Sequence, residues 1–159
     1  VLAAAACAIK IGISPDLIKK GLEKVRSEKG RLELIELQNF TILDDSYNAN
    51  PESMKAAIDS LKQFSGKKVL VLGTMAELGK DSSKLHQEIG DYAREQNIDS
   101  LITIGQEAQY FKGSHFDDIE SIFNEIDNYH KGATILIKGS RKMELNKLVD
   151  ILINTSNSS

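Results

Sequence analysis

The sequence of 159 residues has a single cysteine, Cys7, and no tryptophan. One cysteine excludes a disulfide framework and favours a reducing compartment, the cytoplasm. In an Ala-rich segment we expect Cys7 to be a small core residue rather than a nucleophile. No apolar run reaches the roughly 18 residues that a membrane-spanning helix needs, so we predict no membrane span.

An excess of positive charge is also lacking. The chain has 20 Lys and Arg residues against 23 Asp and Glu residues, a net charge of −3. This balance does not predict the basic surface of a nucleic-acid-binding domain. The three histidines, His86, His115 and His130, have no metal-ligand spacing. We therefore predict no metal site in this chain. We expect each histidine to lie either at the surface or in the core with its ring nitrogens hydrogen-bonded.

Glycine-rich phosphate-binding motifs are missing as well. The stretch GTMAELGKD looks like a phosphate loop, but five residues separate Gly73 from Gly79, and Asp81 replaces the hydroxyl residue. The GxGxxG fingerprint is absent too, which argues against a nicotinamide-dependent dehydrogenase. An ordinary strand-to-helix loop is the alternative interpretation of this stretch.

The chain does contain a regular alternation of strand and helix patterns. Short apolar runs typical of buried strands alternate with segments that place apolar residues on one helical face. The expected strands are 32–37, 40–45, 67–73, 100–105 and 133–139, the first two forming a hairpin through Gln38 and Asn39. The expected helices cover 51–64, 85–93, 119–126 and 145–152, with a short one near Glu107. This order predicts an α/β fold with a mostly parallel sheet and helices on both faces.

The beginning of the chain has a different pattern. An Ala-rich helix over 1–11 precedes a second helix, for which Ser14 and Pro15 are suitable first residues. The charged stretch RSEKGR then predicts a linker, and we place a domain boundary near Lys29. Since the first residue is Val rather than Met, we expect the sequence to be part of a longer protein.

Polar residues follow three of the predicted strands. These segments are DDSYNANP, GTMAELGKDS and KGSRKM. Parallel sheets bind ligands beyond the carboxyl ends of their strands, where these three segments are expected to lie together.

In the first segment, Asp44 and Asp45 should point to opposite faces, so that only one of them reaches a ligand. An aspartate in this position can accept both hydroxyls of a ribose. Tyr47 adds an aromatic face and Asn48 an amide.

The end of the same segment is explained by helix capping. Asn50 followed by Pro51 is typical of an N-cap and a first helical residue. Ser53 stands where a capping box has Glu or Gln, so we expect the box to be incomplete.

The third segment is basic. Arg141 carries a planar fork suited to a carboxylate or phosphate, and Gly139 allows a ligand to approach the backbone. A solvated basic loop is an equally good interpretation of these residue types.

Together, these segments resemble a known family. GRLE, DDSYNANPESMKAAI, VLVLGTMAELG followed by LHQEIG, ITIG and IKGSRKM resemble the C-terminal part of Mur ligases, in the same order and over essentially the whole chain. DDSYNANP is the most specific segment. It is similar to that of the members that add D-alanyl-D-alanine to UDP-N-acetylmuramoyl-tripeptide in peptidoglycan precursor synthesis.

The resemblance implies a division of the chain and of the site. Residues 1–28 look like the last helices of a central ATPase domain, and 29–159 look like a C-terminal Rossmann-like domain. The family uses ATP and Mg²⁺ to convert the tripeptide carboxylate into an acyl phosphate, which the dipeptide amine attacks. The phosphate loop, the magnesium ligands and a carbamylated lysine belong to the central domain. The resemblance therefore implies no catalytic residue in this chain alone, and no turnover by it.

Roles for individual residues also follow from the resemblance. Arg31 matches the arginine that reaches the ATP phosphates, and Asp45 matches the aspartate that holds the ribose, with Tyr47 and Asn48 as their neighbours. The expected substrate-binding residues are Thr74, Met75, Glu77, Ser140 and Arg141. Family members often have Asp where this chain has Thr74, so its role stays open. The alternative hypothesis is a non-catalytic nucleotide- or peptide-binding module of the same fold.

Overall fold

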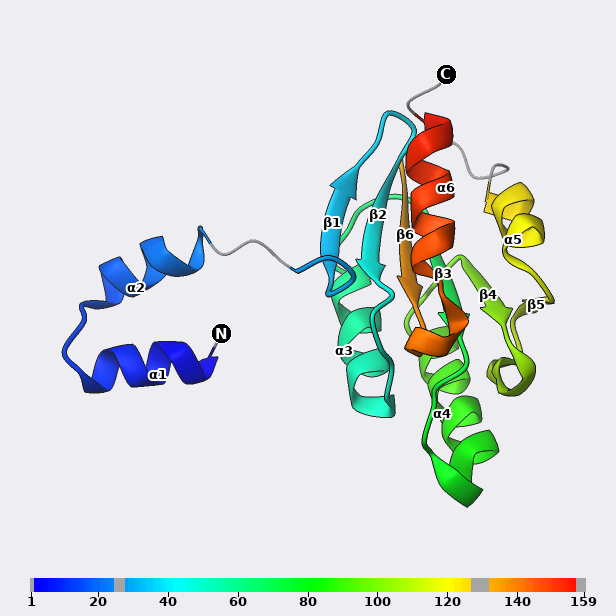
Figure 1. Cartoon of the computed structure of the whole chain (residues 1–159), viewed down its shortest axis with the longest axis horizontal. Coiled ribbons are helices and arrows are strands. Elements are labelled where there is room, and N and C mark those ends of the chain that lie inside the picture. The colour runs from blue at the N-terminus through cyan, green and yellow to red at the C-terminus, as the bar shows by residue number, and fades with distance from the viewer. Residues whose placement is uncertain (1, 25–27, 127–131, 157–159) are drawn as a thin grey trace.

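The computed structural model in Figure 1 describes residues 2–24, 28–126 and 132–156. Their main feature is a six-stranded sheet in the order β1-β2-β6-β3-β4-β5. The strands are β1 (Glu33–Glu36), β2 (Phe40–Asp45), β3 (Lys68–Gly73), β4 (Ser100–Ile104), β5 (Ser114–Phe116) and β6 (Ala133–Lys138). β1 runs antiparallel to β2, and the other neighbouring pairs are parallel. The predicted α/β fold with a mostly parallel sheet is therefore confirmed.

The strand predictions differ from the structure at one edge of the sheet. The hairpin through Gln38 and Asn39 is confirmed, since the Leu37 backbone N–H donates to the Phe40 carbonyl at 3.0 Å. β5 was not predicted. It has only three residues and pairs with β4 alone, so it carries too little apolar pattern to be found in the sequence.

Helices cover both faces of the sheet. α3 (Pro51–Leu61) and α4 (Ser82–Glu95) pack on one face, and α5 (Ile119–Ile126) and α6 (Asn146–Ser156) pack on the other (Figure 1). The helix expected near Glu107 is a 3-10 segment, η2 (Gln106–Phe111). Two further 3-10 turns are η1 (Gly79–Asp81) and η3 (Arg141–Met143). None of these described helices is long and apolar enough to cross a membrane.

The core consists of two layers because successive strand residues point to opposite faces of the sheet. One layer joins strand residues to α3 and α4: Leu43, Leu70, Leu72, Leu136, Met54, Ile58 and Ile89. The other layer joins the alternate strand residues to α5 and α6: Ile42, Val69, Val71, Ile135, Ile137, Ile122, Leu148 and Val149. The sheet is thus buried on both sides, and its polar residues are left to the strand ends.

The first two helices, α1 (Leu2–Lys10) and α2 (Pro15–Leu22), have little core of their own. Ser14 caps α2 as predicted, since its hydroxyl accepts from the Leu17 backbone N–H at 3.4 Å. The expectation that Cys7 is a core residue is wrong, because Cys7 is exposed on a helix that packs on little beyond α2. Residues 26 and 27 of the expected linker lie outside the described residues.

The start of α3 shows a complete capping box. The Asn50 side chain accepts from the Ser53 backbone N–H at 2.8 Å, and the Ser53 hydroxyl accepts from the Asn50 backbone N–H at 3.1 Å. The prediction that Asn50 is the N-cap is confirmed. The prediction of an incomplete box is wrong, because the short serine side chain replaces the Glu or Gln of the usual motif.

Gly90 of α4 provides a test of the packing between α4 and η2. A β-carbon at position 90 would lie 2.1 Å from the Phe111 carbonyl oxygen, so Gly90→Ala must push α4 away from η2. We expect a loss of about 2 kcal/mol in the free energy of unfolding, measured by urea denaturation. The matched control is Gly21→Ala, since a β-carbon there meets nothing within 4 Å. Equal effects of the two substitutions would contradict this account of the packing.

Candidate functional site

The site is built where the carboxyl ends of β2, β6 and β3 lie side by side. The parallel register places Asp45, the last residue of β2, opposite Lys138, the last residue of β6. The Lys138 ammonium donates to the Asp45 carboxylate at 2.5 Å and to the Asn48 carbonyl at 2.9 Å. The side chain of Lys138 is only 3% exposed and that of Asp45 17%. The two strand ends are therefore joined by a largely buried ion pair.

Lys138 was not among the predicted site residues. The signal was present, since ATILIK is a strand of apolar and hydroxyl residues that ends in a lysine. In the sequence Lys138 lies at the end of the expected strand 133–139 and begins the basic segment KGSRKM, for which a solvated loop is an equally good interpretation. The sheet order decides its environment, because it places the end of β6 between β2 and β3.

The segment before β1 is bonded to the segment after β2. The Asp45 carboxylate accepts from the Leu32 backbone N–H at 3.0 Å, and the Tyr47 backbone N–H donates to the Gly30 carbonyl at 3.0 Å. Gly30 has φ +75°, and a β-carbon there would lie 3.2 Å from the Tyr47 nitrogen, so glycine suits this close approach. These bonds place Arg31 beside Tyr47.

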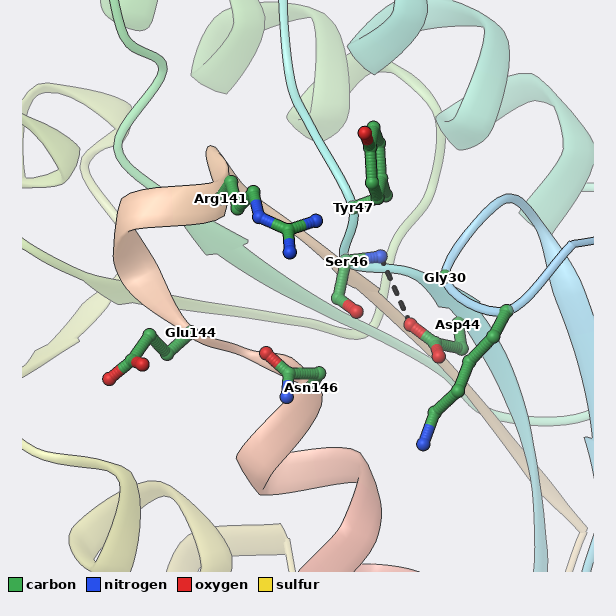
Figure 2. A pocket seen from close by; sticks show the side chains of 8 residues that line it. Gly30, Asp44, Ser46, Tyr47, Arg141, Glu144 and Asn146 are labelled. Carbon is green, nitrogen blue, oxygen red and sulfur yellow. Dashed lines mark hydrogen bonds between the residues drawn. The ribbon is translucent and has the colours of Figure 1, made fainter.

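Asp44 and Asp45 point to opposite faces, as predicted. Asp44 is fully buried, and one of its carboxylate oxygens accepts from the Ser46 backbone N–H at 3.0 Å (Figure 2). Its other oxygen has no hydrogen-bond partner in the structure. We expected only one of the two aspartates to reach a ligand, whereas the structure places each of them beside a different cavity.

The larger cavity, which we call the Asp44 cavity, has a volume of about 460 Å³. In Figure 2 Arg141 lies on one side of it, Asp44 on the other, and Asn146 below. The lining is mostly polar: Lys29, Gly30, Asp44, Ser46, Tyr47, Arg141, Glu144 and Asn146. Groups of both charges line the same space, so the cavity suits a ligand that also carries both charges.

The second cavity, which we call the Asp45 cavity, has a volume of about 370 Å³. Three residues predicted for the nucleotide, Arg31, Asp45 and Asn48, line it together with Tyr47. The remaining lining residues are Gly30, Leu32, Ala49, Asn50, Ser53 and Lys138. The four predicted nucleotide-binding residues are thus brought together.

Tyr47 lines both cavities. The Arg31 guanidinium carbon lies 4.4 Å from the centre of the Tyr47 ring, and that of Arg141 lies 5.2 Å from it. Such distances are within the range of cation–π attraction. Tyr47 is 41% exposed, so we infer that its ring holds two accessible cations at the boundary of the two cavities.

The remaining predicted residues are Thr74, Met75 and Glu77 in the loop after β3 and Ser140 in the loop after β6. The Ser140 backbone N–H donates to the Thr74 carbonyl at 3.0 Å, which places this loop beside the loop after β6. Glu77 is exposed, Thr74 is half-buried, and Ser140 is buried. Met75 is buried among the core residues on the α3 and α4 side, so its side chain packs in the core.

Within the described residues, no group of three or more His, Cys, Asp or Glu side chains could hold a metal ion. His86 is buried, and His115 is exposed with its Nδ1 3.0 Å from the Thr103 hydroxyl. His130 lies outside the described residues.

Comparisons with known proteins identify the family and the fold of this chain. Residues 30–141 match the family model described as Mur ligase, glutamate ligase domain. The chain is 38% identical to the Escherichia coli UDP-N-acetylmuramoyl-tripeptide–D-alanyl-D-alanine ligase over 95% of its own length and 35% of that relative. The chain therefore spans about a third of the length of the relatives that it matches.

Two solved structures have the same fold. MurF from Acinetobacter baumannii superimposes with a TM-score of 0.84 at 34% identity, over 96% of this chain and 36% of that one. The MurF ligase from Thermotoga maritima, solved in complex with ADP, superimposes with a TM-score of 0.82 at 29% identity. The match covers 91% of this chain and 35% of that one. Since the family model covers most of the chain, this chain belongs to the Mur ligase family and contains its glutamate ligase domain.

Proposed function

We propose that the chain is the C-terminal part of a cytoplasmic ATP-dependent ligase that adds D-alanyl-D-alanine to UDP-N-acetylmuramoyl-tripeptide in peptidoglycan precursor synthesis. One observation carries this proposal: two polar cavities meet at Tyr47, one lined by the predicted nucleotide residues and the other by Arg141. A ligase must hold a nucleotide and an amino substrate next to each other. The activity for which the Escherichia coli relative is named supports the same reaction.

We assign α1 and α2 to the end of a central ATPase domain, with the boundary near Lys29. The two helices and the turn between them expose large apolar side chains, including Ile9, Ile11 and Leu17, each of which is more than 60% exposed. Exposed apolar groups of this size generally pack against another part of a protein. The central domain is our proposed partner for them.

The Asp45 cavity is the proposed site for the nucleoside end of ATP. Lys138 and the Leu32 N–H each use one lone pair of the Asp45 carboxylate, and carboxylate oxygens have further lone pairs for ribose hydroxyls. Arg31 lies on the same cavity with 56% of its side chain exposed, so it can turn toward the phosphates. Tyr47 and Asn48 complete this wall of the site.

The Asp44 cavity is the proposed site for the dipeptide, which is a zwitterion. Arg141 suits the terminal carboxylate, because a guanidinium binds a carboxylate through two parallel hydrogen bonds. The Asp44 carboxylate, whose second oxygen lacks a partner, lies buried at the wall of this cavity, so its negative charge can attract the ammonium group. Thr74, Glu77 and Ser140 come from the two loops that are bonded to each other beside Arg141, and Met75 supports them from the core.

ATP and Mg²⁺ supply the activated phosphoryl group for this reaction. We propose that most of the contacts to ATP and to Mg²⁺ come from the central domain. The residues of this chain then position the nucleoside and the dipeptide when the domains close. No step of bond formation is assigned to a side chain of this chain, so we expect the chain alone to be inactive.

The nucleotide assignment is tested by Arg31→Ala in the full-length protein. Arg31 is exposed, so its loss should leave the fold intact while the KM for ATP rises roughly tenfold, about 1.4 kcal/mol of binding. The measurement is steady-state kinetics with ATP varied. The matched control is Lys84→Ala, which removes an exposed, ion-paired cation of α4. If Arg31→Ala has the same KM for ATP as the wild type, Arg31 does not bind the nucleotide.

The dipeptide assignment is tested by Asp44→Asn, which keeps the shape of the side chain and removes its charge. We expect the KM for D-alanyl-D-alanine to rise by roughly tenfold or more, because an ammonium group loses its anionic partner. The KM for ATP should change little. A dipeptide whose amine is replaced by a hydroxyl should inhibit wild type and Asp44→Asn equally, since it never used the charge. If the KM for the dipeptide is unchanged in Asp44→Asn, the Asp44 carboxylate does not bind the dipeptide, and its unpaired oxygen binds water instead.

The binding-module alternative makes a different prediction. We propose that each cavity forms only one side of a binding site and that the central domain forms the other side. The chain alone should therefore bind both ligands weakly. Calorimetry of this chain with ATP and with D-alanyl-D-alanine separates the two hypotheses. Micromolar binding of either ligand by the chain alone would favour the binding module.

A further inference from the structure

His86 is a buried polar side chain that the proposed site does not use. It lies in α4, is 0% exposed, and bonds to the backbone through both ring nitrogens. The Met75 backbone N–H donates to Nε2 at 2.9 Å. Nδ1 lies 2.8 Å from the Ser82 carbonyl oxygen, which can only accept. These partners assign the neutral tautomer with the proton on Nδ1.

The two bonds of His86 connect different parts of the chain. Ser82 begins α4, whereas Met75 belongs to the loop after β3 that carries Thr74 and Glu77. The bond to Ser82 stays within the helix. The bond to Met75 is the one that reaches out of the helix, and it fixes the backbone of this loop.

The loop is held from its other side by the loop after β6. The Thr74 carbonyl accepts from the Ser140 N–H at 3.0 Å, and the Thr74 N–H donates to the Ile104 carbonyl at 3.2 Å. Thr74 is thereby fixed to the sheet. The next backbone N–H, that of Met75, is fixed by His86, and only then does the chain turn out to the exposed Glu77 with φ +64°. His86 thus controls where the loop leaves the sheet.

The surroundings of His86 explain why its ring cannot move aside. The Phe111 ring of η2 lies 4.8 Å from the imidazole, and Gly90 of α4 packs directly on the Phe111 backbone. The Ser82 hydroxyl lies 3.3 Å from Nδ1 and donates to the Glu107 carboxylate of η2. Glu107 and Lys80 are the charged residues that line the cavity at the start of α4, together with Ser82.

An imidazole in this place is not needed to fill space. The neighbouring core residues on this side of the sheet, including Met54, Met75, Ile89, Ala108 and Phe111, are apolar. A phenyl ring of similar size would fit such surroundings but would leave the buried Met75 N–H without an acceptor. What histidine adds is the acceptor at Nε2, and hence a fixed position for the loop.

We propose that His86 is a positioning residue for the dipeptide half of the site, acting through the Met75 N–H on the loop that carries Thr74 and Glu77. This inference rests on the proposed ligase function. No residue of this loop lines either cavity, but the Thr74 carbonyl accepts from the N–H of Ser140, the residue before Arg141 of the Asp44 cavity. The loop is therefore connected to the dipeptide half of the site, and His86 should affect dipeptide binding while leaving nucleotide binding unchanged.

The test compares His86→Phe with His86→Gln in the full-length protein. Phenylalanine keeps the ring and removes the acceptor, so the KM for D-alanyl-D-alanine should rise at least tenfold while the KM for ATP stays within twofold. Glutamine can place its amide oxygen near the position of Nε2 and should restore most of the wild-type KM. The matched control is the same pair of substitutions at His115, an exposed histidine of β5 at the far edge of the sheet, which should change neither constant.

A second measurement does not depend on activity. In wild-type protein labelled with ¹⁵N-histidine, the His86 imidazole should show one protonated Nδ1 and one unprotonated Nε2, and the Met75 amide should exchange slowly. In His86→Phe this protection should be lost while the protection of the sheet amides remains. A protonated Nε2 in the wild type, or a protected Met75 amide in His86→Phe, would overturn the inference.

The outcomes separate this inference from the function on which it rests. If the wild-type protein does not ligate D-alanyl-D-alanine, the proposed function fails, and the role of His86 fails with it. If the wild type is active but His86→Phe changes both KM values equally or neither, only the positioning role is overturned. Failure of glutamine to improve on phenylalanine would also overturn it.

Discussion

The ion pair between Lys138 and Asp45 determines the geometry of this end of the sheet. A buried ammonium is tolerated only with partners, and Lys138 finds them in the Asp45 carboxylate and the Asn48 carbonyl. Because Asp45 also accepts from the Leu32 N–H, the same carboxylate ties together the ends of β2 and β6 and the segment before β1. Removing one partner of such a pair typically costs about 3–5 kcal/mol, since the other charge stays buried and unpaired. The position of the carboxylate is thus set by the fold before any ligand arrives.

The alternation of a strand turns two adjacent aspartates into parts of two different cavities. Asp45 points to the side of α3, where Asn50 and Ser53 begin the helix, and Asp44 points to the side of α6, where Glu144 and Asn146 lie. Tyr47 follows at the turn and lines both spaces. In the proposed function, one short segment, DDSYN, would therefore contact both the nucleotide and the dipeptide, and Tyr47 is the side chain of this segment that lines both cavities.

Much of the fold could be predicted because its signals are local. Periodicity located the central strands and the helices, and DDSYNANP predicted the N-cap and contains residues that line the Asp45 cavity. Lys138 and Ser53 were misjudged or missed for a different reason, and of His86 the sequence predicted only that it lies at the surface or hydrogen-bonded in the core. A lysine after a strand and a serine at the third helical position are ordinary solvated residues in the sequence, and the partners of a histidine on a helix are not visible there. They become structural only through partners at a distance, since Lys138 pairs with a residue 93 positions away. Such pairings depend on the order of strands in the sheet, which periodicity does not give.

The two guanidinium groups over the Tyr47 ring are the part of the site that most favours an anionic ligand. Arg31 and Arg141 carry like charges and yet are held near one ring, at 4.4 and 5.2 Å from its centre. The ring attracts both, and Glu28 partly neutralises Arg31 at 3.3 Å, but both interactions are solvent-exposed and therefore weak. A phosphate or carboxylate placed between the two cations would relieve their repulsion and keep the attraction to the ring. Since Tyr47 lies where the two cavities meet, an anionic group in either cavity would lie near one of the two guanidinium groups. In the proposed function the ATP phosphates would pair with Arg31 and the dipeptide carboxylate with Arg141, so the two ligands would be held next to each other without competing for one cation.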